Sequence, residues 1–342
     1  MGPGRTVLRR EPERLIGRSG TSTQRDRVLA WLLEEDQPAI RYLTLRDLLH
    51  RPRSDPELAR AQRAIASTGW AADILALRDP AGWWVSEESL YRPKYRATNW
   101  QLLVLAELGL TRAVRPIRDS CELWMRRFAA RGGGVGGNGV GTAHHCAAGN
   151  QARALIEFGY GDDPRVTRTL EWLVATADPK GGWSCFGRGR NLDSWEGLSA
   201  LAAYPQGKRT AAMQDAAERG AEFFLERELH RQGARYAPWF RLHYPVHYYY
   251  DLLVGLDVLT RLGFTDDPRL GFALDFLRKK RRPDGRWNLD AVHPDVEGSI
   301  AKWFREHPGQ RPEPLAFETP GAPSKMVTLR ALRVLDRVEG PR

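Results

Sequence analysis

Cysteine, lysine and long apolar runs are all scarce in this chain of 342 residues. Three cysteines, Cys121, Cys146 and Cys185, are too few for a disulfide framework and are typical of a reducing compartment. No segment approaches the ~18 uncharged apolar residues of a membrane-spanning helix. Residues 1–23 are basic but lack the apolar core of a secretory signal. We therefore expect a cytoplasmic protein with a flexible basic tail over residues 1–23 and no transmembrane segment.

Lysine supplies only 7 of the 52 basic residues, so arginine dominates the net charge of +10. The arginines are spread along the chain among aspartate and glutamate, which favours a solvated surface of mixed charge. A positive field that attracts diphosphates or nucleic acid is the alternative. Because the sequence has neither zinc-finger spacing nor an aromatic-basic RNA motif, we expect no nucleic-acid partner.

A stretch of the chain recurs after an offset of 104 residues. Three landmarks share this offset: Gly159 and Gly263, Asp163 and Asp267, and Trp183 and Trp287. Half the offset is the length of a helix pair with its turns, and weaker copies lie between and before the strong ones. Each unit is expected to end its first helix at the glycine, where a left-handed cap suits that residue. Asp-Pro then begins the second helix, and a Gly-x-Trp turn, matched upstream by Gly82 and Trp83, places tryptophan in the seam between pairs.

The units predict an all-α fold, an α/α toroid of about six helical hairpins. Five helix pairs are expected at about 38–84, 95–136, 144–187, 194–240 and 247–288. A first helix near 24–35 and a last helix near 324–338 are left unpaired, and pairing them closes the ring and removes exposed apolar ends. We predict a single toroid domain over residues 24–342, with a long crossing loop at 289–323.

Two of the turns carry a family resemblance. Lys180–Trp183 and Pro283–Trp287 resemble the Gln-x-x-Asp-Gly-x-Trp repeat turn of the terpenoid cyclase and protein prenyltransferase superfamily, which includes squalene cyclase-like repeats. The resemblance implies a toroid that binds an apolar or isoprenoid-like substrate in its central cavity, and an enzyme of the transferase or cyclase type. The Asp-x-Asp-Asp motif with which class II cyclases protonate their substrate is absent. Asp119–Cys121 matches the zinc-binding Asp-x-Cys of prenyltransferases but falls on an outer helix.

The helix starts at one mouth of the ring are the expected site, because free N–H groups there favour anions and thiolates. Cys146 and Tyr250 each lie 13 residues before an aligned glycine, which places both at this mouth. Cys146, Cys185 and either His144 or His145 are candidate zinc ligands, and three such ligands leave an open catalytic position. The alternative is that both cysteines are small buried hydrophobes.

The aromatic run 243–251 reaches the same mouth. His247 and Asp251 are expected to form a proton-transfer pair, with Tyr250 beside them. The alternative is a helix start whose rings pack in the seam. The glycine-rich segment 132–141 is a candidate lid. Two further functions stay open: a zinc-dependent enzyme acting on thiols or peptides, and a non-catalytic helical-repeat binding protein. The expected partner is a small molecule or a peptide.

Overall fold

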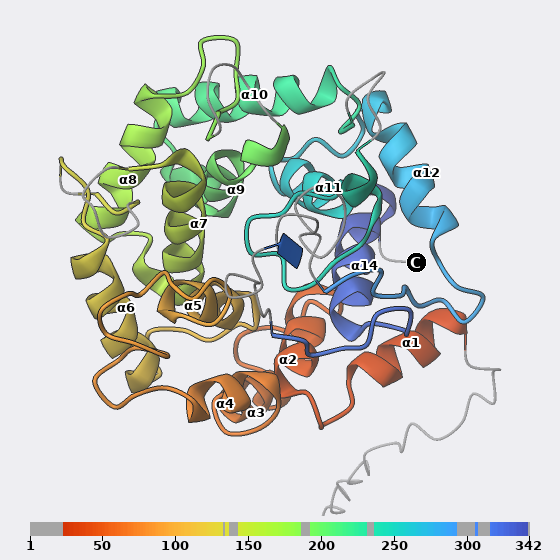
Figure 1. The fold of residues 1–342 in the computed structure, drawn as a ribbon. Coiled ribbons are helices and arrows are strands. Elements are labelled where there is room, and N and C mark those ends of the chain that lie inside the picture. The colour runs from red at the N-terminus through yellow and green to blue at the C-terminus, as the bar shows by residue number, and fades with distance from the viewer. Residues whose placement is uncertain are drawn as a thin grey trace, which may run out of the picture.

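The computed structural model describes residues 23–132, 134–136, 143–185, 192–230, 236–292, 305–306 and 315–340. Within them the helices follow one another around a closed ring (Figure 1). The described residues form helices and loops with no strand, apart from three isolated bridges. The predicted basic tail, most of the glycine-rich segment and much of the 289–323 loop lie outside the described residues.

The inner wall of the ring consists of helices that are apolar on almost every side. In α5 every residue from Thr98 to Ala106 is buried, as expected for a helix enclosed by others. From α5 to α14 each inner helix contacts the next, and the last helix, α14, contacts the first, α2. The inner helices are α2 (Pro38–Asp47), α5 (Thr98–Glu107), α7 (His145–Leu155), α9 (Glu196–Ala203), α11 (Leu252–Arg261) and α14 (Lys325–Glu339).

The outer wall consists of amphipathic helices. In α6, Ile117, Cys121 and Trp124 face the core, while Arg126 and Arg127 are exposed. The outer helices are α1 (Gln24–Leu32), α3 (Pro56–Ala64), α6 (Arg115–Arg127), α8 (Pro164–Ala175), α10 (Ala211–Leu225) and α12 (Gly271–Lys279), with the short α4 (Trp70–Ala76) after α3. The described part of the chain therefore forms six inner–outer pairs, which confirms the predicted α/α toroid.

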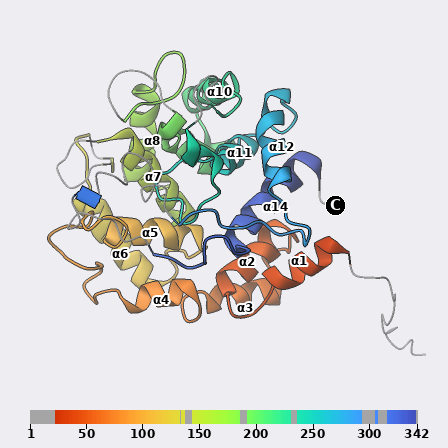
Figure 2. The same cartoon turned by 45° about the vertical axis from the view of Figure 1, so that its right-hand side comes forward.

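The ends of the chain close the ring. Figure 2 shows α1 and α14 side by side. The guanidinium of Arg25 donates to both carboxylate oxygens of Asp336, at 2.9 and 2.7 Å. Lys325 at the start of α14 also donates to Glu34 at 2.8 Å and Asp36 at 2.9 Å. The predicted pairing of the first and last helices is confirmed.

The predicted helix boundaries follow from the residues expected to make them. Gly159 and Gly263 have φ of 94° and 98°, the left-handed conformation in which glycine carries no steric penalty. Asp163 and Asp267 each accept the amide N–H two residues ahead at 2.9 Å and so cap the start of the next helical segment.

Trp183 and Trp287 occupy the seams between helix pairs, as predicted. They are 1% and 0% exposed. Each indole N–H donates to the carbonyl ten residues earlier, Leu173 at 3.0 Å and Leu277 at 2.8 Å. The hydrogen bond satisfies the one polar atom of a large buried ring.

The upstream copy of this turn is shifted by one residue from the predicted position. Trp84, not Trp83, is buried and donates its indole N–H to Ile74 at 2.7 Å, again ten residues earlier. Its amide donates to Thr98 Oγ1 at 2.9 Å on the next inner helix. Two adjacent tryptophans made the register ambiguous in the sequence.

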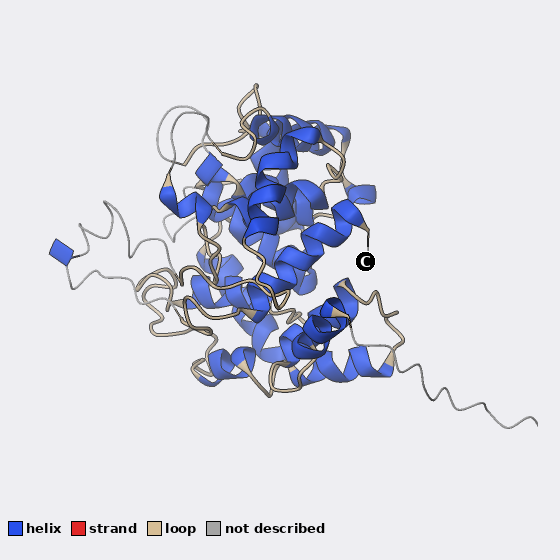
Figure 3. Cartoon of the chain, turned by 90° about the vertical axis from the view of Figure 1, so that its right-hand side faces the viewer, coloured by secondary structure: helices blue, strands red, loops and turns tan. Residues whose placement is uncertain are grey.

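Figure 3 shows the arrangement of helices and connecting loops in the described part of the chain. None of the helices described is long and apolar enough to cross a membrane.

Candidate functional site

The two cysteines expected at the mouth of the ring lie side by side. Cys146 is in the first turn of α7, and Cys185 follows the turn that contains Trp183. The amide of Cys146 donates to Sγ of Cys185 at 2.7 Å. Both side chains are partly buried. The structure therefore brings together two of the four candidate zinc ligands.

The neighbouring histidines face other partners. Nδ1 of His145 lies 2.9 Å from the carbonyl of Ser184, and Nε2 lies 3.0 Å from Oγ1 of Thr176. The ring stacks on Trp172 with centroids 5.0 Å apart. His144 is exposed just before α7. No three His, Cys, Asp or Glu side chains in the described segments are grouped so that they could hold a metal ion. The described residues therefore do not fit the predicted three-ligand zinc site.

Asp251 pairs with His243, not with His247. Its Oδ1 accepts the amide of Val254 at 2.7 Å, which caps α11. Its Oδ2 lies 2.7 Å from Nδ1 of His243, and both side chains are 0% exposed. A capping carboxylate points back along the preceding chain, and the reversal over residues 243–250 brings His243 to it. The buried histidine–carboxylate pair is thus made by a residue that spacing alone did not single out.

His247 belongs to an aromatic cluster with Tyr95 and Trp100. Its ring stacks on Tyr95 at 4.9 Å and meets the edge of Trp100 at 5.5 Å. Burial, followed by electrostatic interaction with His243 and Arg153, lowers the pKa of His247 to about 3. The imidazole is therefore neutral at neutral pH.

Tyr248 and Tyr250, in the same run, make hydrogen bonds through their hydroxyls. The hydroxyl of Tyr250 donates to the carbonyl of Leu229 at 2.7 Å, so it holds two segments together. The hydroxyl of Tyr248 accepts from Lys94 at 2.8 Å and from Tyr95 at 2.9 Å. The run 243–250 therefore packs against neighbouring segments of the toroid. This supports the alternative that its aromatic side chains pack in the seam.

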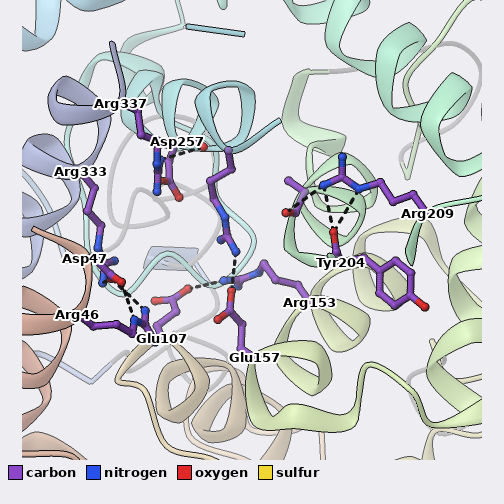
Figure 4. Close-up of polar contacts among 12 residues, drawn as sticks. Arg46, Asp47, Glu107, Arg153, Glu157, Tyr204, Arg209, Asp257, Arg333 and Arg337 are labelled. Carbon is purple, nitrogen blue, oxygen red and sulfur yellow. Dashed lines mark hydrogen bonds and ion pairs between the residues drawn. The ribbon is translucent and has the colours of Figure 1, made fainter. Parts of the chain in front are cut away.

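A cavity of about 240 Å³ lies in the middle of the ring, toward the C-terminal ends of the inner helices. Six arginines face four carboxylates in its lining, which leaves two positive charges in excess. Figure 4 shows several of these side chains converging from different helices. The arginines are Arg46, Arg153, Arg261, Arg330, Arg333 and Arg337, and the carboxylates are Asp47, Glu107, Glu157 and Asp257. A second hollow of about 380 Å³ adjoins the first and shares Arg46, Asp47, Arg333 and Arg337 with it.

Every carboxylate of the cavity has an arginine partner. The pairs are Glu107 with Arg153 at 3.1 Å, Glu157 with Arg261 at 2.8 Å, Asp257 with Arg337 at 2.7 Å, and Asp47 with both Arg46 and Arg333. Burial alone would raise the pKa of Asp257. The positive charges of Arg337, Arg261 and Arg330 outweigh burial, so the pKa of Asp257 lies below its usual range. The same balance holds the pKa values of Asp47 and Glu157 below their usual ranges. These groups are ionised at neutral pH.

Arg330 is the exception among the arginines. Its side chain lines the cavity, and the residue is 8% exposed. It makes no hydrogen bond or ion pair with any described residue, and its Nη1 is buried without an acceptor. Nε of Arg153, a residue 7% exposed, also lacks an acceptor. A buried N–H donor without an acceptor is costly, so these two donors fit an anion bound in the cavity.

The cavity also has an apolar side. Leu43, Val254, Val258 and Met326 line it from the inner helices, and Trp195 lines it from the start of α9. The lining therefore suits a ligand with one charged end and one apolar end.

The sequence contained a signal for this site. Arg330, Arg333 and Arg337 recur at the spacing of one helical face, on a helix that closes the inner ring. Charges on an inner face, where apolar side chains are expected, indicate a polar cavity. The even spread of arginine along the chain, which is typical of a solvated surface, hides this pattern in the sequence.

Comparison with known proteins gives similarities of fold alone. No protein-family model matches the chain, and no curated protein matches it. A crystal structure of a protein from Actinoplanes is 18% identical with a TM-score of 0.45, over 91% of this chain and 98% of that one. The type II terpene cyclase MstE from Scytonema, in its apo form, is 18% identical with a TM-score of 0.44, over 88% of each chain. A variant of that cyclase bound to geranylgeranyl dihydroxybenzoate is 15% identical with a TM-score of 0.32, over 92% of this chain and 98% of that one.

Proposed function

We propose that this toroid binds a small isoprenoid-like molecule with an anionic head in its central cavity. The observation that carries the proposal is Arg330, a cavity-lining guanidinium that is 8% exposed and has no partner among the described residues. A bound anion supplies the missing partner. The apolar wall around Trp195 and Val258 receives the rest of the ligand.

The charge balance of the cavity favours a phosphate-type head over a carboxylate. The lining carries two positive charges in excess. A phosphate or diphosphate matches two charges, whereas a carboxylate matches one. Arginine also presents its donors in a planar fork that suits phosphate oxygens.

The size of the cavity favours a short ligand. About 240 Å³ lies just below the ~300–1,000 Å³ range of typical ligand pockets. The adjoining hollow of about 380 Å³ is lined by charged side chains and His50, so it offers room for the head and not for the chain.

The reaction class that such a site serves is prenyl transfer or cyclisation that begins with departure of the anionic head. Preorganised arginines stabilise negative charge as it develops on a leaving diphosphate. The sequence lacks the Asp-x-Asp-Asp motif for protonating a substrate, so a start by ionisation fits the residues better than a start by protonation.

Calorimetric titration of the full chain tests the binding step. Geranyl diphosphate, which has a short chain, and inorganic diphosphate should bind. Geraniol should bind at least ~10-fold more weakly, because it lacks the anionic head. Arg330→Met keeps the length of the side chain and removes its charge, and it should weaken diphosphate binding by at least ~10-fold. Arg115→Met changes an arginine whose side chain is 83% exposed and serves as the matched control.

Two results would overturn the proposal: geraniol binding as tightly as geranyl diphosphate, or unchanged diphosphate binding in Arg330→Met. Release of diphosphate from the bound substrate, measured over time, then separates an enzyme from a non-catalytic binding protein.

A further inference from the structure

The thiols of Cys146 and Cys185 are placed for reaction with each other. The sulfur of Cys185 lies 2.7 Å from the amide nitrogen of Cys146, which brings it beside the Cys146 side chain. The backbone of Cys185 is held by its own amide, which donates to Oγ of Ser194 at 3.1 Å. Ser194 is 1% exposed, so this anchor is buried. The two sulfurs come from segments 39 residues apart yet meet at one point.

The environments of the two sulfurs differ. Sγ of Cys185 accepts an amide N–H in the first turn of α7, a helix of 11 residues. Interaction with the Cys185 side chain, followed by burial, raises the pKa of the Cys146 thiol. The thiol of Cys146 therefore keeps its proton until the second step, and the first attack falls to Cys185.

We infer that Cys146 and Cys185 form a redox-active dithiol that is oxidised reversibly to an intramolecular disulfide by small disulfides such as oxidised glutathione. Neither cysteine lines the central cavity, so this chemistry is independent of the ligand proposed there.

The reaction consists of two thiol–disulfide exchanges. The Cys185 thiolate attacks one sulfur of oxidised glutathione, the glutathione S–S bond breaks, and one glutathione thiolate leaves. Cys146 then loses its proton to that thiolate and attacks the sulfur of Cys185, which expels the second glutathione. The chain loses two electrons and two protons as thiols become a disulfide, and oxidised glutathione is reduced to two molecules of glutathione.

Cys121 provides an internal reference. It is 0% exposed in the core of the outer wall, and burial raises the pKa of its thiol. It should stay reduced under conditions that oxidise the other two. Because the chain has three cysteines, the only expected intramolecular disulfide joins Cys146 to Cys185.

The experiment equilibrates the purified full chain in glutathione buffers of increasing oxidised fraction, alkylates the remaining thiols and measures the intact mass. We expect loss of two alkylation sites together, with the mass of two hydrogen atoms removed and a peptide linked through Cys146 and Cys185. In Cys146→Ser, Cys185 should accumulate a mixed disulfide with glutathione. In Cys185→Ser, Cys146 should react roughly tenfold more slowly, because burial still raises the pKa of its thiol. Cys121→Ala should form the same disulfide as the unaltered chain.

Circular dichroism of each variant establishes that it is folded before its thiols are compared. Two results would overturn the inference: both thiols remaining reduced in the most oxidising buffer, or Cys185→Ser reacting as fast as Cys146→Ser. Metal analysis before oxidation gives a third, since zinc bound by the pair and protecting both thiols assigns them to a metal instead.

Discussion

Arg153 of α7 and Glu107 of α5 form an ion pair at 3.1 Å across the wall of the central cavity, with side chains only 9% and 13% exposed. Arg330 lines the same cavity without such a partner among the described residues. Two arginines of similar burial therefore have opposite consequences for the stability of the ligand-free protein.

Arg153→Met should destabilise the protein by ~3–5 kcal/mol, because it leaves Glu107 buried without its partner. Urea unfolding, followed by fluorescence of the tryptophans, measures the loss. Glu107→Gln in the same background should recover part of it, since the uncompensated charge is then removed as well. A loss below ~1 kcal/mol is the value of an exposed pair and would contradict the burial of this one.

Arg330→Met should leave the free energy of unfolding unchanged or raise it by ~1–4 kcal/mol, because an apolar side chain of similar length replaces a buried charge. The same substitution weakens diphosphate binding, so stability and binding move in opposite directions. A clear destabilisation without ligand would show that the charge of Arg330 stabilises the fold. It would contradict the proposal that Arg330 serves to bind a ligand.

Trp183→Ala and Trp287→Ala should each cost ~3–5 kcal/mol, because a fully buried ring leaves a cavity that the helices cannot close. Phe272→Ala is the matched control, since Phe272 is 44% exposed and its truncation should cost under ~0.5 kcal/mol. The measurement is the midpoint of thermal or urea unfolding. Equal small losses at all three positions would contradict a seam role for the two tryptophans.

Sequence reasoning succeeded where local chemistry dictates the outcome. Gly159 ends a helix because the chain there needs a positive φ, and Asp163 begins one because its carboxylate accepts a free amide. Such features repeat at a fixed offset, so the helix pairs and their number could be predicted. Ring closure followed because α1 and α14 were the only helices without partners.

The candidate site depended on contacts that spacing does not encode. Nothing in the run 243–251 tells which histidine reaches Asp251, because that depends on how the chain reverses between them. The residues that line the cavity could not be predicted either, because they depend on which face of each inner helix turns toward the centre of the toroid. The one-residue shift from Trp83 to Trp84 has the same origin, since two adjacent rings satisfy the same pattern and only packing distinguishes them.

The ion pair between Arg25 and Asp336 should contribute to ring closure by about 1 kcal/mol, because it joins the two ends of the chain and is partly buried. Arg25→Asp should lower the unfolding midpoint, and Asp336→Arg alone should do the same. The double exchange should recover most of the loss, and a double-mutant cycle gives the coupling. A coupling that is absent at low salt would show that α1 is held by packing alone.

The stability of the protein should fall as the pH drops from about 6.5 toward 5, through the protonation of His247 in the unfolded chain. The pKa of His247 is about 3 when folded and 6.5 as an ordinary histidine, so the unfolded chain takes up the proton first. The stabilisation is fully present above pH 6.5 and declines toward pH 3, with a slope of up to ~1.4 kcal/mol per pH unit for one group. The buried carboxylates Asp257 and Glu157 have lowered pKa values and add their own loss only below about pH 4.

His247→Asn isolates this contribution, because asparagine tolerates the positive φ of 48° at this position and does not titrate. The variant should be less stable at pH 7, because it loses the packing of the imidazole ring. Its free energy of unfolding should nevertheless change less between pH 6.5 and 5. His144→Asn alters an exposed histidine at the same mouth and should keep the slope of the unaltered protein. Urea unfolding at each pH gives the slopes. An unaltered slope in His247→Asn would mean that the folded protein protonates His247 as readily as the unfolded chain does, and that the imidazole reaches water through the aromatic cluster.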